Sequence, residues 1–302
     1  MIKAEVTYSF VNEELFKSRI LPYIFGCGMF YTKMNPVLKI KEKEKRFFTS
    51  FIVETKTLTQ FVAATTGMLR FSPDCILEEI NIIKCDKVES KRLPPTLEET
   101  PLIGAILKPA IFYQESIKGI IRYAINNNFD FVKDDDASEY SVEEVLQIKN
   151  LIKDLKYLQK ITRLDDVQSE WVMVVPFVYG WTLLEQSSKK RITASHCASL
   201  PSQISWSVFV IFSRLAGASM VVGADTKFDS TWNLIEILKT ASIKIEGVPE
   251  TKIILGGGIN PKRIEEVLKS IKKENYKNIG FAIGSWIANE IEKTNINLNK
   301  KL

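Results

Sequence analysis

The sequence predicts an α/β protein in which a C-terminal TIM-type (β/α) barrel follows a smaller N-terminal α+β domain of the ferredoxin-like type. Two observations predict this fold. The first hundred residues contain alternating segments typical of antiparallel strands, whereas the rest of the chain repeats a strand–helix unit. We place the two domains at residues 1–95 and 96–302.

The N-terminal domain is predicted from three alternating segments and one helix. Residues 4–10, 47–54 and 79–85 alternate apolar and polar side chains, as half-buried strands do. Residues 56–69 suit a helix that packs on the resulting sheet. Residues 88–100 contain two prolines and many charges, so we interpret them as a linker to the next domain.

The barrel is predicted from repeated strand–helix units, because parallel strands need such crossovers. The repeat supplies seven units, and eight are usual in this fold. We interpret residues 142–160 as one helix, which leaves no room for a further unit between Lys133 and Trp171. We therefore expect a barrel that lacks one βα unit, the third. The expected strands lie at 102–107, 129–133, 171–179, 192–195, 218–222, 252–255 and 279–283.

Composition excludes several classes of protein. The chain has 302 residues, a net charge of +5, four cysteines without a CxxC pair and a single histidine. A Cys/His zinc site and a disulfide framework are therefore not expected. The mild positive charge does not indicate a nucleic-acid partner, and no apolar run reaches the length of a membrane span. We expect a cytoplasmic protein with neither a nucleic-acid nor a membrane partner.

Chemistry in such a barrel lies where the strands end, so the residues at those positions are the candidates for a functional site. One strand ends in Lys133 followed by three aspartates, and carboxylates at 135 and 136 suit a hard divalent cation. A polar turn with a helix cap is the alternative for these aspartates. The glycines at 256–258 suit either a phosphate or an ordinary turn, and His196 suits either a substrate contact or the barrel interior.

The order of these motifs resembles one known family. The segment GAILKP at residues 104–109 precedes DFVKDDD at 130–136. The pair resembles the large subunit of ribulose-1,5-bisphosphate carboxylase/oxygenase (RuBisCO) and RuBisCO-like proteins, in which a G-x-x-x-K-P strand precedes a D-F-x-K-D-D-E segment. The resemblance continues through His196 and residues 214–218, 255–259 and 281–284.

The resemblance implies a metal site. Lys133 would take up carbon dioxide and become a carbamate, which is an anionic oxygen ligand. Asp135 and Asp136 would complete a site for Mg²⁺. The metal would bind a phosphorylated ketose and stabilise its enediolate. The family also forms sites between subunits, which implies a homodimer.

Further roles follow from the same resemblance. Lys108 would correspond to the proton donor or cation near the reacting carbon. His196 would contact the substrate, and Lys227 would correspond to the lysine of the mobile loop after the sixth strand. The phosphate of the substrate would lie against Gly257, Gly258 and Gly284.

Several positions depart from the family pattern. Ala110 replaces a lysine, Asp136 a glutamate and Cys197 an arginine, while Val222 stands for a histidine and Gly256 for a serine. Three functions therefore stay open. They are Mg²⁺-dependent enolisation or isomerisation of a phosphorylated ketose, carboxylation by a compact ribulose-bisphosphate carboxylase (a lyase), and an inactive binding or assembly role.

Overall fold

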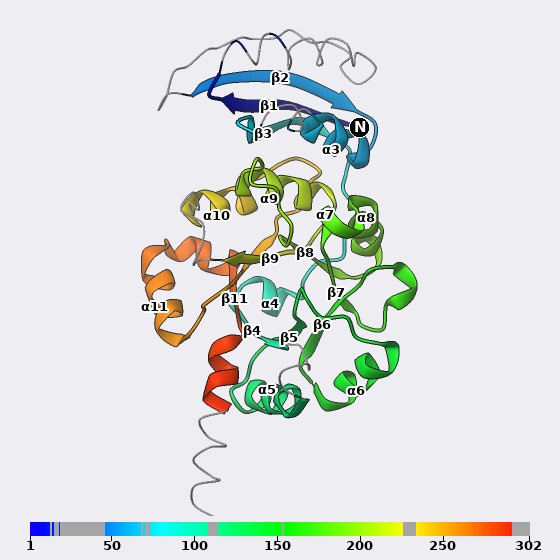
Figure 1. Ribbon diagram of the computed structural model, residues 1–302, viewed down its shortest axis with the longest axis vertical. Helices are drawn as coiled ribbons and strands as arrows, with labels where there is room; N and C mark the ends of the chain where they lie inside the picture. The colour runs from blue at the N-terminus through cyan, green and yellow to red at the C-terminus, as the bar shows by residue number, and fades with distance from the viewer. Residues whose placement is uncertain are drawn as a thin grey trace, which may run out of the picture.

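The structure is a computed structural model, and it describes residues 1–12, 14, 18, 46–67, 69, 73–107, 114–152, 154–225 and 234–291. A small sheet lies at one end of the molecule, and a barrel with its surrounding helices forms the rest (Figure 1). No helix within the described ranges is long and apolar enough to cross a membrane.

The N-terminal sheet has three antiparallel strands in the order β2-β1-β3. They are β1 (Ile2–Phe10), β2 (Phe47–Thr55) and β3 (Ile76–Cys85). Helix α3 (Leu58–Thr66) begins after Thr57, whose hydroxyl accepts a hydrogen bond from the Gln60 amide. The first part of β1 buries every second side chain, because one face of the sheet packs on α3 and the core. The predicted α+β arrangement is confirmed.

Eight parallel strands form a closed barrel in the order β10-β11-β4-β5-β6-β7-β8-β9. Their closure confirms the predicted TIM-type architecture. Inside the barrel, the Phe131 ring lies over Gly104, where an added Cβ atom would come within 2.3 Å of that ring. The strands are β4 (Leu102–Leu107), β5 (Phe131–Asp134), β6 (Lys156–Lys160), β7 (Trp171–Val174), β8 (Ile192–His196), β9 (Met220–Asp225), β10 (Lys252–Gly256) and β11 (Ile279–Ile283).

The expectation of a missing unit was wrong. Helix α6 ends at Ile152, and β6 follows at residues 156–160 and pairs with both β5 and β7. What the third unit lacks is an α-helix, because only the 3₁₀ turn η3 (Leu164–Asp166) lies between β6 and β7. The connection is too short for a packed helix, yet the strand is retained, so the barrel closes with its full number of strands.

Apart from α4, the other helices surround the barrel (Figure 1). The expected strand at 171–179 ends at Val174 and continues as a helical turn, α7, and the expected linker includes the short helix α4. The helices are α4 (Pro95–Glu98), α5 (Gln114–Asn126), α6 (Val142–Ile152), α7 (Pro176–Tyr179), α8 (Trp181–Lys190), α9 (Trp206–Leu215), α10 (Leu234–Ser242), α11 (Pro261–Ser270) and η4 (Lys273–Asn278).

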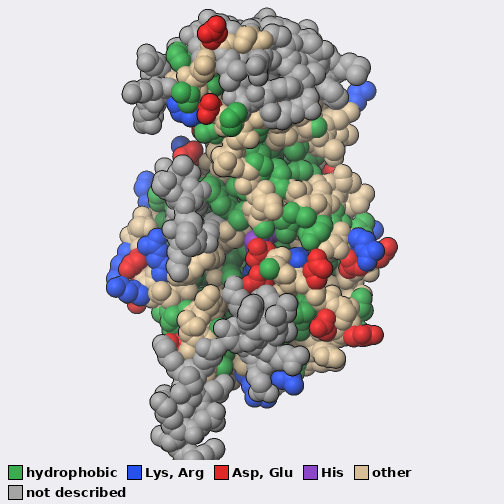
Figure 2. Space-filling view, in the orientation of Figure 1, with side chains coloured by type: hydrophobic (Ala, Val, Ile, Leu, Met, Phe, Trp, Pro, Cys, Tyr) green, Lys and Arg blue, Asp and Glu red, His purple; other side chains and the backbone are tan. Residues whose placement is uncertain are grey.

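Aromatic packing joins the sheet to the barrel. The Phe212 ring of α9 contacts Phe61 of α3 and Trp181 of α8, with ring centroids 6.1 Å and 5.4 Å away. Leu77 of β3 also forms an isolated bridge with Ile204, which precedes α9. Figure 2 shows hydrophobic side chains gathered where the sheet meets the barrel. This contact holds the N-terminal sheet against the helices of the barrel.

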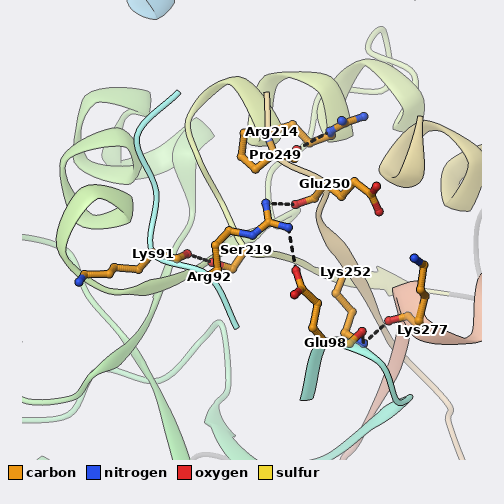
Figure 3. A network of polar contacts seen from close by, with 9 residues as sticks. All are labelled: Lys91, Arg92, Glu98, Arg214, Ser219, Pro249, Glu250, Lys252 and Lys277. Carbon is orange, nitrogen blue, oxygen red and sulfur yellow. Dashed lines mark hydrogen bonds and ion pairs between the residues drawn. The ribbon is translucent and has the colours of Figure 1, made fainter. Parts of the chain in front are cut away.

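A polar network closes the N-terminal end of the barrel, opposite the end where the predicted site lies (Figure 3). Arg92 donates to Glu98 over 2.7 Å, and the Ser219 hydroxyl donates to the Lys91 carbonyl over 2.6 Å. Lys252 is buried, and its ammonium donates to the carbonyls of Thr100, Glu98 and Lys277. The segment before β4 is therefore fixed to the starts of β9, β10 and β11.

Candidate metal and substrate site

The barrel brings most of the predicted site residues to one end. Lys133 lies in β5, and Asp135 and Asp136 follow that strand directly. His196 is the last residue of β8. Gly257 and Gly258 follow β10, and Gly284 follows β11. Because parallel strands end at the same rim of a barrel, these residues share one face. Lys108 and Lys227 lie outside the described residues.

Lys133 is buried within the barrel, with 2% of its surface exposed. Its ammonium donates a hydrogen bond of 2.6 Å to the backbone carbonyl of Asp134. The Lys133 backbone pairs with Ile106 of β4 and with Leu158 of β6, so the lysine lies between two neighbouring strands. A buried amine with a nearby carbonyl acceptor is an uncommon feature, which marks Lys133 as a functional candidate.

Asp134 fastens β5 to β6. One carboxylate oxygen accepts from the Tyr157 hydroxyl over 2.6 Å, and the other accepts from the Lys160 amide over 2.7 Å. Burial raises the pKa of Asp134 to about 6, while these two hydrogen bonds and the charge of Lys133 oppose the rise. Asp134 therefore serves the alignment of the two strands, and both its oxygens are already used.

Asp135 and Asp136 lie close to one another in the turn after β5. Asp135 is buried, and its carboxylate accepts from the Ala137 amide over 3.1 Å. Residue 136 is exposed as a whole, although its carboxylate is partly desolvated. Partial burial raises the pKa of Asp136, and the neighbouring Asp135 carboxylate raises it further, whereas the charge of Lys133 lowers it. Two carboxylates that repel each other in this way favour a cation between them.

Lys160 belongs to the same group of charges, and the sequence analysis missed it. Its ammonium donates to the Asp136 carbonyl over 3.0 Å, and its charge acts on Asp134 and His196. The sequence pattern predicts Lys160 at the end of a helix over residues 142–160. If residues 156–160 are read as a strand, Lys160 falls at the same rim of the barrel as Lys133. Recognising that strand is therefore what the prediction of Lys160 required.

His196 faces the charges of β5. Burial lowers the pKa of His196 well below its ordinary value, the charge of Lys133 lowers it further, and Asp135 opposes both effects. The Ala198 amide donates to Nδ1 over 3.1 Å, so the neutral ring carries its proton on Nε2. An added Cβ atom at Gly223 of β9, whose φ is +98°, would come within 2.9 Å of this ring. The absence of a side chain at Gly223 therefore leaves room for the His196 ring.

The predicted phosphate loops have suitable backbone geometry. Gly257 and Gly258 have φ values of +63° and +69°, a conformation that favours glycine. The turn leads into α11, which Asn260 caps by accepting from the Arg263 amide over 2.9 Å. Gly284 is followed by helical residues 285–291, and its carbonyl accepts from the Ile287 amide over 3.0 Å. Two helix N-termini thus begin at the rim, where backbone amides attract anions.

The described histidine, cysteine and carboxylate side chains do not form a complete metal site by themselves. Within the described ranges, no three of these side chains are grouped so that they could hold an ion. The candidate donors are two carboxylates with a lysine beside them. A third oxygen ligand would therefore have to come from a modified Lys133 or from a bound molecule.

Comparisons with known proteins reveal the fold. No protein-family model and no curated protein sequence matches the chain. Among solved structures, a RuBisCO-like protein from Rhodopseudomonas palustris superposes with a TM-score of 0.71 at 16% identity, covering 94% of both chains. The octameric RuBisCO of Pyrococcus horikoshii has a TM-score of 0.70 at 14% identity, over 93% of this chain and 82% of that one. A RuBisCO-like protein from Alicyclobacillus acidocaldarius has a TM-score of 0.62 at 12% identity, over 93% and 88%.

The chain therefore has the fold of RuBisCO and RuBisCO-like proteins along nearly its whole length, as the motifs predicted. Structural similarity at such low sequence identity defines the fold only. The chemistry has to be argued from the residues of the site.

Proposed function

We propose that this protein is a RuBisCO-like enzyme that uses Mg²⁺ to enolise or isomerise a phosphorylated ketose-type substrate. The observation that supports this proposal is the meeting of Lys133, Asp135, Asp136 and His196 at one end of the barrel. The fold shared with RuBisCO-like proteins adds support, because the motifs that resemble that family in sequence lie at strand ends of this barrel.

The donor chemistry fits Mg²⁺ if Lys133 becomes a carbamate. Asp135, Asp136 and the carbamate would then offer three anionic oxygens, which is the ligand type that Mg²⁺ prefers. After desolvation, the Asp135 carboxylate is the next cause of the raised pKa of Asp136, and a cation would relieve the repulsion between the two carboxylates. When bound, Mg²⁺ would polarise the carbonyl of the ketose.

The chain's own residues would bind and orient the substrate. His196 is neutral and carries its proton on Nε2, so it suits donation of a hydrogen bond to a substrate oxygen. The loops at Gly257, Gly258 and Gly284 would hold the phosphate through backbone amides. Lys108 and Lys227 would supply a proton donor and a loop cation, and both roles rest on the sequence resemblance alone. A homodimer in the cytoplasm is part of the same proposal.

One alternative has specific support. The exposure of Asp136 and the hydrogen bond between Asp135 and the Ala137 amide are also what a plain polar turn would have. An inactive RuBisCO-like binding or assembly protein is therefore the second candidate. Cys197 and Val222 stand where the carboxylase pattern has an arginine and a histidine, and they disfavour full carboxylation.

Proton exchange distinguishes these functions. We would incubate the protein with Mg²⁺, bicarbonate and a panel of phosphorylated ketoses in deuterated water and follow the loss of the α-proton signal by NMR. Enolisation predicts exchange with at least one ketose and none with Asp135→Asn. The matched variant Asp154→Asn, at an exposed site away from the rim, should exchange normally. Absence of exchange across the panel would favour the inactive protein.

A further inference from the structure

Among the residues that the structure describes, few pair with the outer edge of β3. β3 is an edge strand, because the sheet order is β2-β1-β3. On its outer side the Leu77 amide donates to the Gln203 carbonyl over 2.8 Å, and the Ser205 amide donates to the Leu77 carbonyl over 3.0 Å. Among the described residues, β1 supplies every backbone partner of residues 79–84. About 20 Å of edge therefore keeps donors and acceptors that no described residue pairs.

This edge forms one wall of a groove of about 1230 Å³. Helices α9 and α10 and residues 243–249 form the opposite wall. The Leu77–Ile204 bridge closes one end, and a hydrogen bond of 2.7 Å from the Val88 amide to the Gly247 carbonyl closes the other. Small-molecule pockets measure roughly 300–1,000 Å³, so this volume suits a longer occupant that lies alongside the strand.

The groove is lined by apolar side chains and by an excess of basic ones. Ile83 and Ile243 are exposed by 54% and 49%, which is unusual for isoleucine. Five basic and three acidic residues line the groove, an excess of two positive charges. No described ion pair involves four of the basic residues, which are Lys84, Lys87, Lys239 and Lys244.

We propose that this groove binds an extended acidic peptide segment of a partner protein, which adds to β3 as a further strand. The backbone edge of β3 supplies hydrogen bonds, and alternate apolar side chains of the peptide pack against the isoleucines. Acidic side chains pair with the lysines that line the groove. None of the residues proposed for the metal site lines the groove, so this function is independent of the chemistry in the barrel.

Fluorescence anisotropy with a labelled peptide of alternating valine and glutamate tests the proposal. We expect saturable binding, together with slower amide hydrogen exchange at residues 79–84. A peptide of alternating valine and lysine should not bind. Lys239→Glu combined with Lys244→Glu should weaken binding about tenfold, since each reversal replaces an attraction by a repulsion. The matched double reversal of Lys262 and Lys269 on α11, at exposed positions outside the groove, should leave binding unchanged.

Three results would overturn the proposal. They are no binding of the acidic peptide, equal binding of the basic peptide, and protection of residues 79–84 that grows with protein concentration in the absence of peptide. The last result would assign the edge to a second copy of this chain.

Discussion

The Tyr157 hydroxyl of β6 donates to the Asp134 carboxylate of β5 over 2.6 Å, next to the strand pair that holds Lys133. The Lys160 amide occupies the second oxygen of the same carboxylate. The third strand of the barrel is therefore fastened to the strand of the proposed metal site, even though no α-helix follows it.

Tyr157→Phe should destabilise the protein by about 1–3 kcal/mol, because a buried carboxylate loses a hydrogen-bond partner. Urea unfolding followed by circular dichroism measures this change. The matched variant Tyr276→Phe loses one bond to the Leu268 carbonyl in a partly exposed place and should cost less. Equal losses in the two variants would contradict the role that we assign to Tyr157.

Gly223→Ala should lower the free energy of unfolding more than Gly180→Ala does. Both glycines have a φ of +98°, so the backbone strain of an alanine is similar. Only at Gly223 would the new Cβ atom meet the His196 ring and the Cys197 sulfur at 2.9 Å, whereas nothing lies within 4 Å of it at Gly180. We expect an excess loss of about 1–3 kcal/mol at Gly223 in urea unfolding, the usual range for overpacking. Similar losses would mean that the ring is not confined by this glycine.

Arg214→Met should reduce the free energy of unfolding by about 3–5 kcal/mol, because three carbonyls lose a charged donor. The buried guanidinium donates to the carbonyls of Pro249, Thr240 and Ile243 over 2.9, 2.6 and 2.8 Å, and thereby ties α9 to the end of α10. Arg263→Met on exposed α11 serves as the control and should change stability by less than about 0.5 kcal/mol. A small loss of stability in Arg214→Met would show that water molecules replace the hydrogen bonds of the guanidinium.

Lys252 should make stability depend on alkaline pH. Burial lowers the pKa of Lys252 from 10.5 to about 8 in the folded protein. Between those values the unfolded chain binds more protons than the folded chain, so this lysine makes stability rise as the pH increases from 8 to 10.5. Lys252→Met should flatten that rise in urea midpoints measured across the range, and exposed Lys262→Met should not. An unchanged slope in Lys252→Met would contradict the lowered pKa.

The elements with strong patterns were predictable, and β6 was not. Repeated apolar strands and helices indicated the barrel, because that periodicity reports burial directly. In β6 only Tyr157, Leu158 and Gln159 are buried, between a lysine at each end, so the segment looked like a continuation of α6. Its pairing with β5 decides its structure, and pairing between strands is not visible in a local pattern.

The dependence on strand pairing also decides which parts of the candidate site could be predicted. The common position of Lys133, Asp135, Asp136 and His196 was predictable because strand ends in a parallel barrel share one rim. Neither the fastening role of Asp134 nor the place of Lys160 could be predicted, since both depend on the register between β5 and β6. The closeness of Gly223 to His196 likewise arises between two strands that the sequence treats separately.

Calorimetric titration of Mg²⁺ with and without bicarbonate tests the central claim most directly. We predict binding only when bicarbonate is present, no binding to Lys133→Met, and normal binding to Lys118→Ala, which removes an exposed lysine from α5. Circular dichroism would confirm that Lys133→Met is folded. Binding that ignores bicarbonate or survives in Lys133→Met, or no binding to the unaltered protein, would contradict a carbamylated metal site at Lys133.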